Sequence, residues 1–285
     1  MPPNEMMGLL RLVARIPLPL LHAFGIAMGW LFYALSPRFR RYHRGNLAKA
    51  KLNISSLRRA AVGETGKAVL ELPAIWLLAH EKSAALVRDI VGWELIEKAM
   101  QDKRGLILLT PHLGCWEVSA QYFSRRYPLT VLYSAPKVKS LEALMRAGRD
   151  RANMKSVPAD MSGVRALYRA LQRGEAIGIL PDQVPGGGEG EWVDFFGHPA
   201  YTMTLAMRMA HARHTPVLIA FARRLPHGRG YEIKVEAMPD EMPGESPARC
   251  MNRAIENLIR ECPTQYLWAY NRYKTPAGVT PPVAL

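Results

Sequence analysis

Short apolar runs that alternate with longer amphipathic stretches constrain the fold of this chain more than any other feature. The runs have the length of strands and are bounded by glycine, proline or polar residues. They fall at residues 106–109, 129–134, 155–158, 176–180 and 217–223. Helical stretches are expected among them at about 139–152, 162–173 and 201–213. Because strands separated by helices need crossover connections, the pattern predicts an α/β domain with a largely parallel central sheet flanked by helices.

Further segments make the predicted sheet mixed. Residues 231–237 alternate apolar and polar side chains directly after the His-Gly-Arg-Gly turn at 227–230. This pattern predicts an antiparallel hairpin partner for the strand at 217–223. Additional helices are expected at about 56–80 with a break at Pro73, at 92–103 and at 247–261.

The N-terminal segment has the composition of a membrane helix. Residues 16–35 form an uncharged run of twenty residues, about the length that crosses the hydrocarbon core of a bilayer. Six basic residues follow within positions 36–51 and only two precede the run, so the positive-inside rule predicts that the rest of the chain faces the cytoplasm. The run either spans the membrane, lies on its surface or is buried in the protein, and we favour membrane attachment.

These features divide the predicted chain into three parts. Residues 1–51 are the N-terminal membrane-associated helix and its basic flank, which suits phosphate headgroups. Residues 52–274 are a single α/β domain, a size that one hydrophobic core can support. Residues 275–285 are rich in proline and threonine and are expected to form a loose tail.

The net charge of +14, with a pI near 9.9, favours anionic partners. Nucleic acid, anionic lipid and an acidic carrier protein all fit this charge, but the sequence has no nucleic-acid recognition motif. The cysteines Cys115, Cys250 and Cys262 have no paired spacing, which predicts a reducing compartment and no disulfide framework. His211 and His214 lack a third ligand at suitable spacing, so no metal site is predicted.

A histidine and a carboxylate follow the strand at 106–109. His112 and Glu117 come directly after a Thr-Pro break, and ligands of open α/β sheets bind beyond the carboxyl ends of strands. His112 is therefore a candidate general base, with Glu117 as the anion that orients it and stabilises the imidazolium. Since residues five apart do not share a helix face, the two meet only if His112 lies before the helix and Glu117 in its first turns. A capping histidine beside a helix-terminal charge is the alternative.

The strand at 176–180 ends in a similar way, with Pro181 followed by Asp182 and Gln183. Polar groups from two strand ends are therefore expected on one side of the sheet. Asp182 either orients a histidine or arginine or merely closes the following turn, and for a lone aspartate we favour the turn. The glycines at 186–188 lack the Gly-Lys-Ser/Thr ending of a phosphate loop, so no nucleotide site is predicted.

Two arginines and a cysteine complete the candidate residues. Arg149 and Arg151 lie near the end of the helix expected at 139–152. They are either solvated charges that favour a helix carboxyl end, or planar donors for a phosphate or a developing oxyanion. Cys115 lies between His112 and Glu117, but small apolar cysteine side chains are commonly buried, so we do not expect a thiol nucleophile.

The ordered set of polar residues resembles one known family, the lauroyl/myristoyl acyltransferases of lipid A biosynthesis, in the lysophospholipid acyltransferase-like superfamily. The set comprises His112, Glu117, Arg149 and Asp182, preceded by the basic amphiphilic N-terminus and followed by the segments 263–268 and 272–274. The resemblance covers nearly the whole chain. The His-x4-Glu motif by itself is moderately specific for the family. The order and spacing of the whole set make the match strong. Residues 113–116 depart from the enterobacterial pattern and the chain is rather short, which leaves the acceptor open.

The resemblance implies an inner-membrane acyltransferase that moves a fatty acyl chain from acyl carrier protein to a hydroxyl of a lipid A precursor. It implies His112 as general base and Glu117 as its orienting partner, with no cofactor and no covalent enzyme intermediate. It implies Arg149 and Asp182 as further active-site members. We expect both to bind substrate, together with the neighbouring Arg151 and Gln183. The basic charge suits an acidic carrier and a phosphorylated lipid at an anionic membrane.

Two alternatives keep the same site. Relatives with this scaffold acylate other glycolipids, including phosphatidylinositol mannosides. A lipid or thioester hydrolase would use water in place of the acceptor at the same His-Glu pair. The sequence alone leaves both open.

Overall fold

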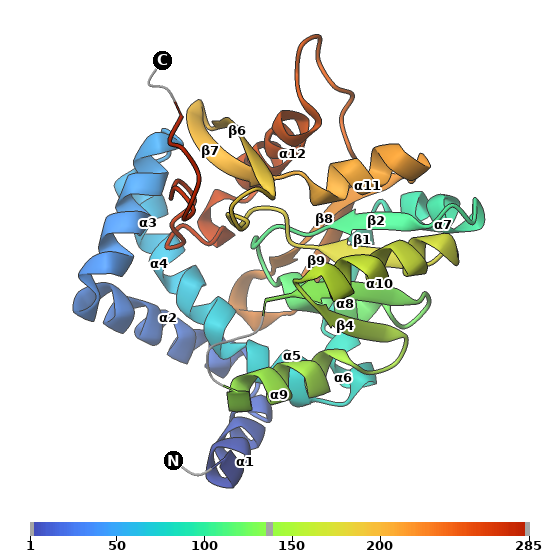
Figure 1. Cartoon of the computed structure of the whole chain (residues 1–285). Coiled ribbons are helices and arrows are strands. Elements are labelled where there is room, and N and C mark those ends of the chain that lie inside the picture. Colours follow the sequence, from blue (N-terminus) through green and yellow to red (C-terminus); the bar gives the residue numbers. More distant parts are fainter. Residues whose placement is uncertain (1–2, 135–138, 283–285) are drawn as a thin grey trace.

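The centre of the fold is a seven-stranded mixed sheet (Figure 1). The computed structural model describes residues 3–134 and 139–282. The strands lie in the order β1–β9–β8–β2–β5–β3–β4. Their bounds are β1 (Val87–Val91), β2 (Leu106–Leu109), β3 (Leu129–Tyr133), β4 (Met154–Pro158), β5 (Ala176–Ile179), β8 (Val217–Arg224) and β9 (Tyr231–Ala237). A separate antiparallel pair joins β6 (Gly190–Phe195) to β7 (His198–Met203).

Most strand pairs in the large sheet are parallel, as the alternation of strands and helices predicts. β2 pairs in parallel with both β5 and β8, and β3 pairs in parallel with β4 and β5. β9 is the antiparallel hairpin partner of β8, and β1 lies parallel to β9 at the sheet edge. The predicted fold class, a largely parallel mixed sheet, is confirmed.

Three strands were not predicted from the sequence. β1 contains the exposed residues Arg88 and Asp89, so it lacks an apolar run. β6 and β7 form a short hairpin whose turn, Phe196–Gly197, has positive φ at both residues. The helix expected at 201–213 begins only at Leu205, because residues 201–203 complete the register of β7 with β6.

Helices cover both faces of the large sheet. Their bounds are α1 (Pro3–Ala14), α2 (Leu18–Leu35), α3 (Pro37–Lys49), α4 (Ser55–Leu70), α5 (Leu72–Leu77), α6 (His80–Ala84), α7 (Trp93–Gln101), α8 (Trp116–Phe123), α9 (Lys139–Arg149), α10 (Met161–Gln172), α11 (Leu205–Arg213) and α12 (Pro247–Glu261). The helix expected at 56–80 is divided into α4 and α5, with Pro73 in the first turn of α5. Proline is tolerated there because the first turn donates no internal hydrogen bond from its N–H groups.

Alternating side chains of β2 separate two hydrophobic cores. Ile107 and Leu109 pack in one core with residues of α10, α11 and α12. Leu106 and Leu108 pack in the other with residues of α5, α7, α8 and α9. Both faces of β2 are therefore buried, which is why its sequence is a continuous apolar run rather than an alternating one.

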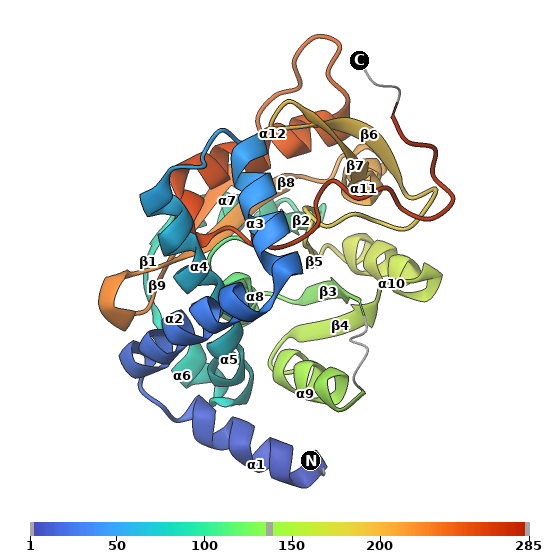
Figure 2. The same cartoon turned by 90° about the vertical axis from the view of Figure 1, so that its left-hand side faces the viewer.

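The apolar segment at the N-terminus forms α2, which packs against α4 (Figure 2). α2 is one helix that is long and apolar enough to cross a membrane, and about a quarter of it (28%) is buried. The two helices approach so closely that a Cβ atom on Gly66 would lie 1.9 Å from the carbonyl oxygen of Gly25. α3 follows α2 after Ser36, whose hydroxyl accepts a hydrogen bond from Phe39 N (3.2 Å) and caps the new helix.

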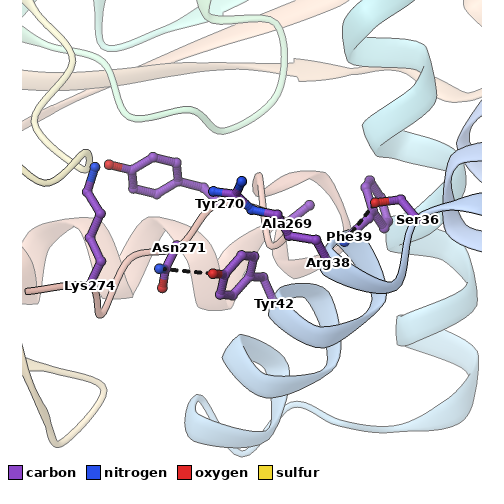
Figure 3. Close-up of a pocket in the computed structure, with 8 residues that line it drawn as sticks. All are labelled: Ser36, Arg38, Phe39, Tyr42, Ala269, Tyr270, Asn271 and Lys274. Atoms are coloured by element: carbon purple, nitrogen blue, oxygen red, sulfur yellow. Dashed lines mark hydrogen bonds between the residues drawn. The ribbon is translucent and has the colours of Figure 1, made fainter.

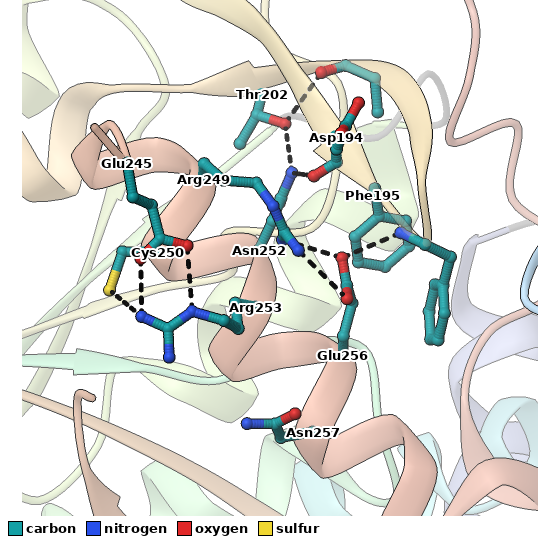
Figure 4. A network of polar contacts seen from close by, with 12 residues as sticks. Asp194, Phe195, Thr202, Glu245, Arg249, Cys250, Asn252, Arg253, Glu256 and Asn257 are labelled. Carbon is teal, nitrogen blue, oxygen red and sulfur yellow. Dashed lines mark hydrogen bonds and ion pairs between the residues drawn. The ribbon is translucent and has the colours of Figure 1, made fainter. Parts of the chain in front are cut away.

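A polar network fastens the β6–β7 hairpin to α12 (Figure 4). The Asn252 amide donates to the carbonyl of Asp194 (2.9 Å) and to the Thr202 hydroxyl (3.0 Å). Glu256 accepts from the backbone N–H of Phe196 (2.9 Å) and pairs with Arg249 (2.9 Å). α12 therefore binds both strands of the hairpin and its turn.

Candidate active site

His112 lies in the loop between β2 and α8, three residues beyond the end of its strand. This loop is anchored on both sides: the carbonyl of His112 accepts from Leu267 N (3.0 Å), and Cys115 N donates to the carbonyl of Ala222 (2.8 Å). Gly114 has φ +62°, and a Cβ atom there would lie 1.9 Å from that Ala222 oxygen. The loop therefore requires glycine at position 114, and the backbone of His112 is fixed by its neighbours.

The carboxylate that holds His112 is Asp182, at the end of the neighbouring strand. Asp182 Oδ1 lies 2.8 Å from His112 Nδ1, and its Oδ2 accepts from the backbone N–H of His112 (3.0 Å). The two residues meet because β2 and β5 pair in parallel with Leu109 opposite Ile179, so positions three further along remain side by side. The expectation that two strand ends place polar groups together is confirmed, whereas the favoured interpretation of Asp182 as a turn residue was wrong.

Glu117 occupies the second residue of α8 and His112 precedes that helix, as the spacing required. However, the Glu117 carboxylate hydrogen bonds to Arg149 and Trp76 instead of His112. The predicted direct pairing of Glu117 with His112 is therefore corrected, because the adjacent strand brings Asp182 to the imidazole instead.

Glu117 is the centre of a buried cluster that joins three helices. Arg149 from α9 donates from Nε to one Glu117 oxygen (3.0 Å) and from Nη2 to the other, forming a two-pronged ion pair. The Trp76 indole from α5 donates to the same carboxylate (3.0 Å). Two prongs fix the plane of the guanidinium as well as its position. Arg149 Nη1 has no hydrogen-bond partner among the residues that the structure describes.

At both carboxylates, the partner side chains lower the pKa by more than burial raises it. Burial raises the pKa of Asp182, but the charge and hydrogen bonds of His112 lower it more, so this pKa lies below its ordinary value. Burial also raises the pKa of Glu117, and Arg149 with Trp76 overcomes that effect, so this pKa is lowered as well. Both side chains are therefore anions at neutral pH.

An ionised Asp182 at 2.8 Å from Nδ1 favours the tautomer of a neutral imidazole that carries its proton on Nδ1 and offers Nε2 as the acceptor. Nε2 lies 3.2 Å from the amide nitrogen of Gln183, and the His112 ring packs 4.8 Å from the ring of Trp116. The structure thus brings Asp182, Gln183 and His112 together. The arrangement presents a basic imidazole nitrogen opposite a side-chain donor, which suits transfer of a proton from a hydroxyl group.

Arg151 is engaged inside the protein. Its guanidinium donates to the carbonyls of Ile75 and Leu78 and to the Gln121 side chain (3.0 Å). These contacts connect the residues after α9 to α5 and α8. The substrate-binding role suggested for Arg151 stays a prediction, and its observed contacts fit a structural role.

Sequence reasoning missed a buried ion pair beneath the His112 loop. Arg224 at the end of β8 forms a two-pronged pair with Glu71 and donates to the carbonyl of Gly114 (2.8 Å). Glu71 also accepts from the Tyr231 hydroxyl (3.0 Å) and lies 3.3 Å from His22 Nε2 on α2. Glu71 stands within an otherwise apolar stretch of sequence, and this was the signal that a buried charge needed a partner.

The candidate nucleophile Cys115 lies inside the protein as a protonated thiol. Cys115 is 1% exposed, and burial raises the pKa of its thiol well above the ordinary value. In the described ranges, no group of three or more His, Cys, Asp or Glu side chains has a geometry that holds a metal ion.

Comparisons with known proteins place this geometry in a family. Residues 6–275 match the family model described as bacterial lipid A biosynthesis acyltransferase. The lipid A biosynthesis lauroyltransferase of Escherichia coli (strain K12) is 26% identical over 282 residues, which cover 95% of this chain and 91% of the relative. A lipid A biosynthesis acyltransferase of Haemophilus influenzae is 26% identical over 277 residues, covering 93% and 88% of the two chains.

The palmitoleoyltransferase of lipid A biosynthesis from Escherichia coli (strain K12) is 24% identical over 284 residues, with 95% of this chain and 91% of the relative covered. The family match extends from α1 to the residues after the last helix, so it includes both strand ends that carry His112 and Asp182. The chain belongs to the bacterial lipid A biosynthesis acyltransferase family and is an acyltransferase.

Proposed function

We propose that this enzyme transfers a fatty acyl chain from the thioester of acyl carrier protein to a hydroxyl of a lipid A precursor at the inner membrane. The observation that carries the proposal is the imidazole of His112, whose Nδ1 is held by Asp182 (2.8 Å) and whose Nε2 lies 3.2 Å from the Gln183 amide. Acyl transfer to a hydroxyl needs a base in this state and a donor for the developing oxyanion.

His112 Nε2 takes the proton of the acceptor hydroxyl as that oxygen attacks the thioester carbonyl carbon. The Gln183 amide leaves Nε2 when the hydroxyl binds, because both use the same lone pair. The negative charge that develops on the carbonyl oxygen is stabilised by Arg149 Nη1. Collapse of the tetrahedral intermediate breaks the carbon–sulfur bond, and the imidazolium returns its proton to the departing thiolate.

Asp182 is the carboxylate that keeps the imidazole in the reactive tautomer and stabilises the imidazolium. Glu117 acts through Arg149: the two-pronged ion pair holds the guanidinium in one orientation while Nη1 remains available. In this mechanism Asp182 binds His112 and Glu117 binds Arg149, in place of a single His112–Glu117 pair.

α2 attaches the enzyme to the membrane and lies along its surface. Seven large apolar side chains of α2 are exposed: Leu20, Phe24, Ile26, Trp30, Leu31, Phe32 and Leu35. α4, which packs against α2, carries Arg58, Arg59 and Lys67. Charged side chains are costly in the hydrocarbon core, so a helix held to α4 suits the interface better than a transmembrane position. The basic residues after α2 favour the cytoplasmic face.

The acyl carrier protein donor is proposed from the family and from the net charge of +14, which attracts an acidic protein. A glycolipid other than a lipid A precursor, such as a phosphatidylinositol mannoside, is the second candidate acceptor, since a general base at His112 would activate a hydroxyl of either lipid. A hydrolase differs only in using water at the same base.

The test measures acyl transfer from acyl carrier protein to a Kdo-bearing lipid A precursor in detergent micelles. His112→Ala is expected to lose at least a few hundredfold in kcat/KM, since a general base contributes roughly 10²–10⁴-fold. His211→Ala is the matched control, because His211 is an exposed histidine on α11. Equal transfer by the His112→Ala protein would refute the mechanism. Free fatty acid released at the same rate with and without acceptor would indicate the hydrolase.

A further inference from the structure

A cavity of about 300 Å³ lies between the start of α3 and the chain segment that follows Trp268 (Figure 3). Its volume is at the lower end of the range for small-molecule sites. One wall comes from the N-terminal membrane-associated part of the chain and the other from the C-terminal segment. The lining residues are Ser36, Arg38, Phe39, Tyr42, Ala269, Tyr270, Asn271 and Lys274.

Buried hydrogen bonds fix the two walls to each other. The Asn46 amide on α3 donates to the carbonyls of Trp268 (2.7 Å) and Tyr270 (2.6 Å). The Asn271 amide donates to the Tyr42 hydroxyl (3.2 Å) across the cavity. The C-terminal segment is anchored further by Arg272, which is 2% exposed and donates to the carbonyl of Tyr201 (2.9 Å). The cavity is therefore formed before any ligand arrives.

The charge of the cavity is positive. Arg38 and Lys274 contribute one cation from each wall, and within the described part of the chain neither forms an ion pair with a carboxylate. Each cation lies against an aromatic ring, Arg38 at 5.7 Å from the Tyr42 centroid and Lys274 at 5.7 Å from the Tyr270 centroid. α3 has no acidic residue in its first turn. A concave site with two cations and no carboxylate favours an anion.

Neighbouring arginines of α3 are used differently. Arg40 donates to the carbonyls of Tyr33 (2.7 Å) and Ala34 (2.6 Å) and so caps the end of α2, and Arg44 donates to the Tyr33 hydroxyl (2.7 Å). These side chains stabilise the α2–α3 corner. Arg38 points instead to the cavity, which distinguishes it from the general basic character of this helix.

The cavity borders the end of α2 on one side, and on the other side its residue Tyr270 contacts the segment that carries Gln183. Ser36 and Phe39 on its rim follow Leu35, the last exposed apolar residue of α2. On the opposite side, the Tyr270 hydroxyl accepts from Val184 N (2.9 Å), next to Gln183. A ligand with acyl chains near α2 and a hydroxyl near His112 would place its polar headgroup in this cavity.

We propose that this cavity binds a phosphate group of the glycolipid acceptor through Arg38 and Lys274. The inference rests on the proposed function, because it assigns a place to the headgroup of that acceptor. The donor contributes its thioester at His112, and the phosphate anchors the acceptor from the membrane side. The site thereby selects phosphorylated acceptors over neutral glycolipids.

The kinetic test compares Arg38→Gln and Lys274→Gln with wild type on a phosphorylated acceptor and on the same acceptor after phosphatase treatment. With the phosphorylated acceptor, each variant is expected to raise KM about tenfold at nearly unchanged kcat, which corresponds to about 1.4 kcal/mol. With the dephosphorylated acceptor, wild type and variants should have the same raised KM. Arg41→Gln is the matched control, since Arg41 is exposed on α3 and does not line the cavity.

A binding test separates this proposal from the proposed reaction. The full-length protein in nonionic detergent is titrated calorimetrically with glucosamine 1-phosphate and with glucosamine. Binding of only the phosphorylated sugar, abolished in Arg38→Gln/Lys274→Gln and retained in Arg41→Gln, supports the site even if acyl transfer fails.

Two results would overturn the proposal. In the first, acyl transfer is active but KM is insensitive to both Arg38 and Lys274. In the second, the variants lose affinity only for vesicles containing phosphatidylglycerol, relative to phosphatidylcholine vesicles, and behave as wild type in nonionic micelles. That pattern would assign the two cations to phospholipid headgroups of the membrane.

Discussion

Asp182→Asn is the substitution that most directly tests the geometry of the active site. The asparagine oxygen can still accept the backbone N–H of His112, which Asp182 binds at 3.0 Å. Its NH₂ group, however, then faces Nδ1, which Asp182 holds at 2.8 Å. An amide donor requires Nδ1 to become the acceptor, so the imidazole proton moves to Nε2 and the base is lost.

The expected magnitude follows from the loss of the reactive tautomer. In serine proteases the equivalent Asp-to-Asn change lowers kcat roughly 10⁴-fold, or about 5.5 kcal/mol of transition-state stabilisation. Asp182 is 2% exposed and makes two bonds to His112, so a loss of about 10³–10⁴-fold in kcat is expected here. The shape of the side chain is conserved, so the thermal midpoint should change by only a few degrees.

The assay is acyl transfer in micelles, measured as a function of pH for wild type, Asp182→Asn and Glu117→Gln. Loss of the carboxylate destabilises the imidazolium, so any residual activity of Asp182→Asn should have its acid limb moved to lower pH. Glu117→Gln should move that limb less, because His112 is the smallest contributor to the lowered pKa of Glu117. It should lower kcat more than it raises KM, because Glu117 orients Arg149, which acts on charge that develops only in the transition state. The opposite pattern, with the limb moved by Glu117→Gln and unchanged in Asp182→Asn, would refute the assignment of Asp182 as the orienting carboxylate.

Three further predictions concern the surroundings of the site. Gly114→Ala places a Cβ atom 1.9 Å from the Ala222 carbonyl at φ +62°, so we expect more than about 2 kcal/mol of lost stability in denaturant melts and roughly a hundredfold loss of activity. The pKa of Glu71 is about 2 against an ordinary 4.5, because Arg224 overcomes the effect of burial; its stabilising contribution, roughly 3 kcal/mol, is present above pH 4.5 and lost as the pH falls toward 2. Wild type should therefore lose stability across that window more steeply than Glu71→Gln, which is already destabilised at pH 7, and parallel curves would contradict this. Cys115→Ser should retain most activity, since the thiol is buried and protonated; inactivation by iodoacetamide in wild type but not in the variant would contradict the absence of a thiol role.

The local pattern of the sequence was sufficient for the parallel sheet and for the position of His112. Both faces of β2 and β5 are buried, so their sequences are continuous apolar runs with clear ends, and the residues after them were recognisable as site candidates. The hairpin of β8 and β9 was also predictable, because a short connection of six residues, 225–230, joins the two strands and contains two glycines. β1 was not predictable, because the apolar residues of this edge strand do not follow a regular alternation or a continuous run.

The sequence by itself determined which residues stand at the strand ends: His112 after β2 and Asp182 after β5. Their partners were decided only by the tertiary structure. Glu117 is five residues from His112 in sequence, yet Asp182, seventy residues away, binds the imidazole, because the order of strands in the sheet places β5 beside β2. Strand order depends on how helices pack on both faces of the whole sheet, and no local segment encodes it. The contacts of Glu117 likewise depend on helix packing, because Arg149 and Trp76 come from two other helices of the fold.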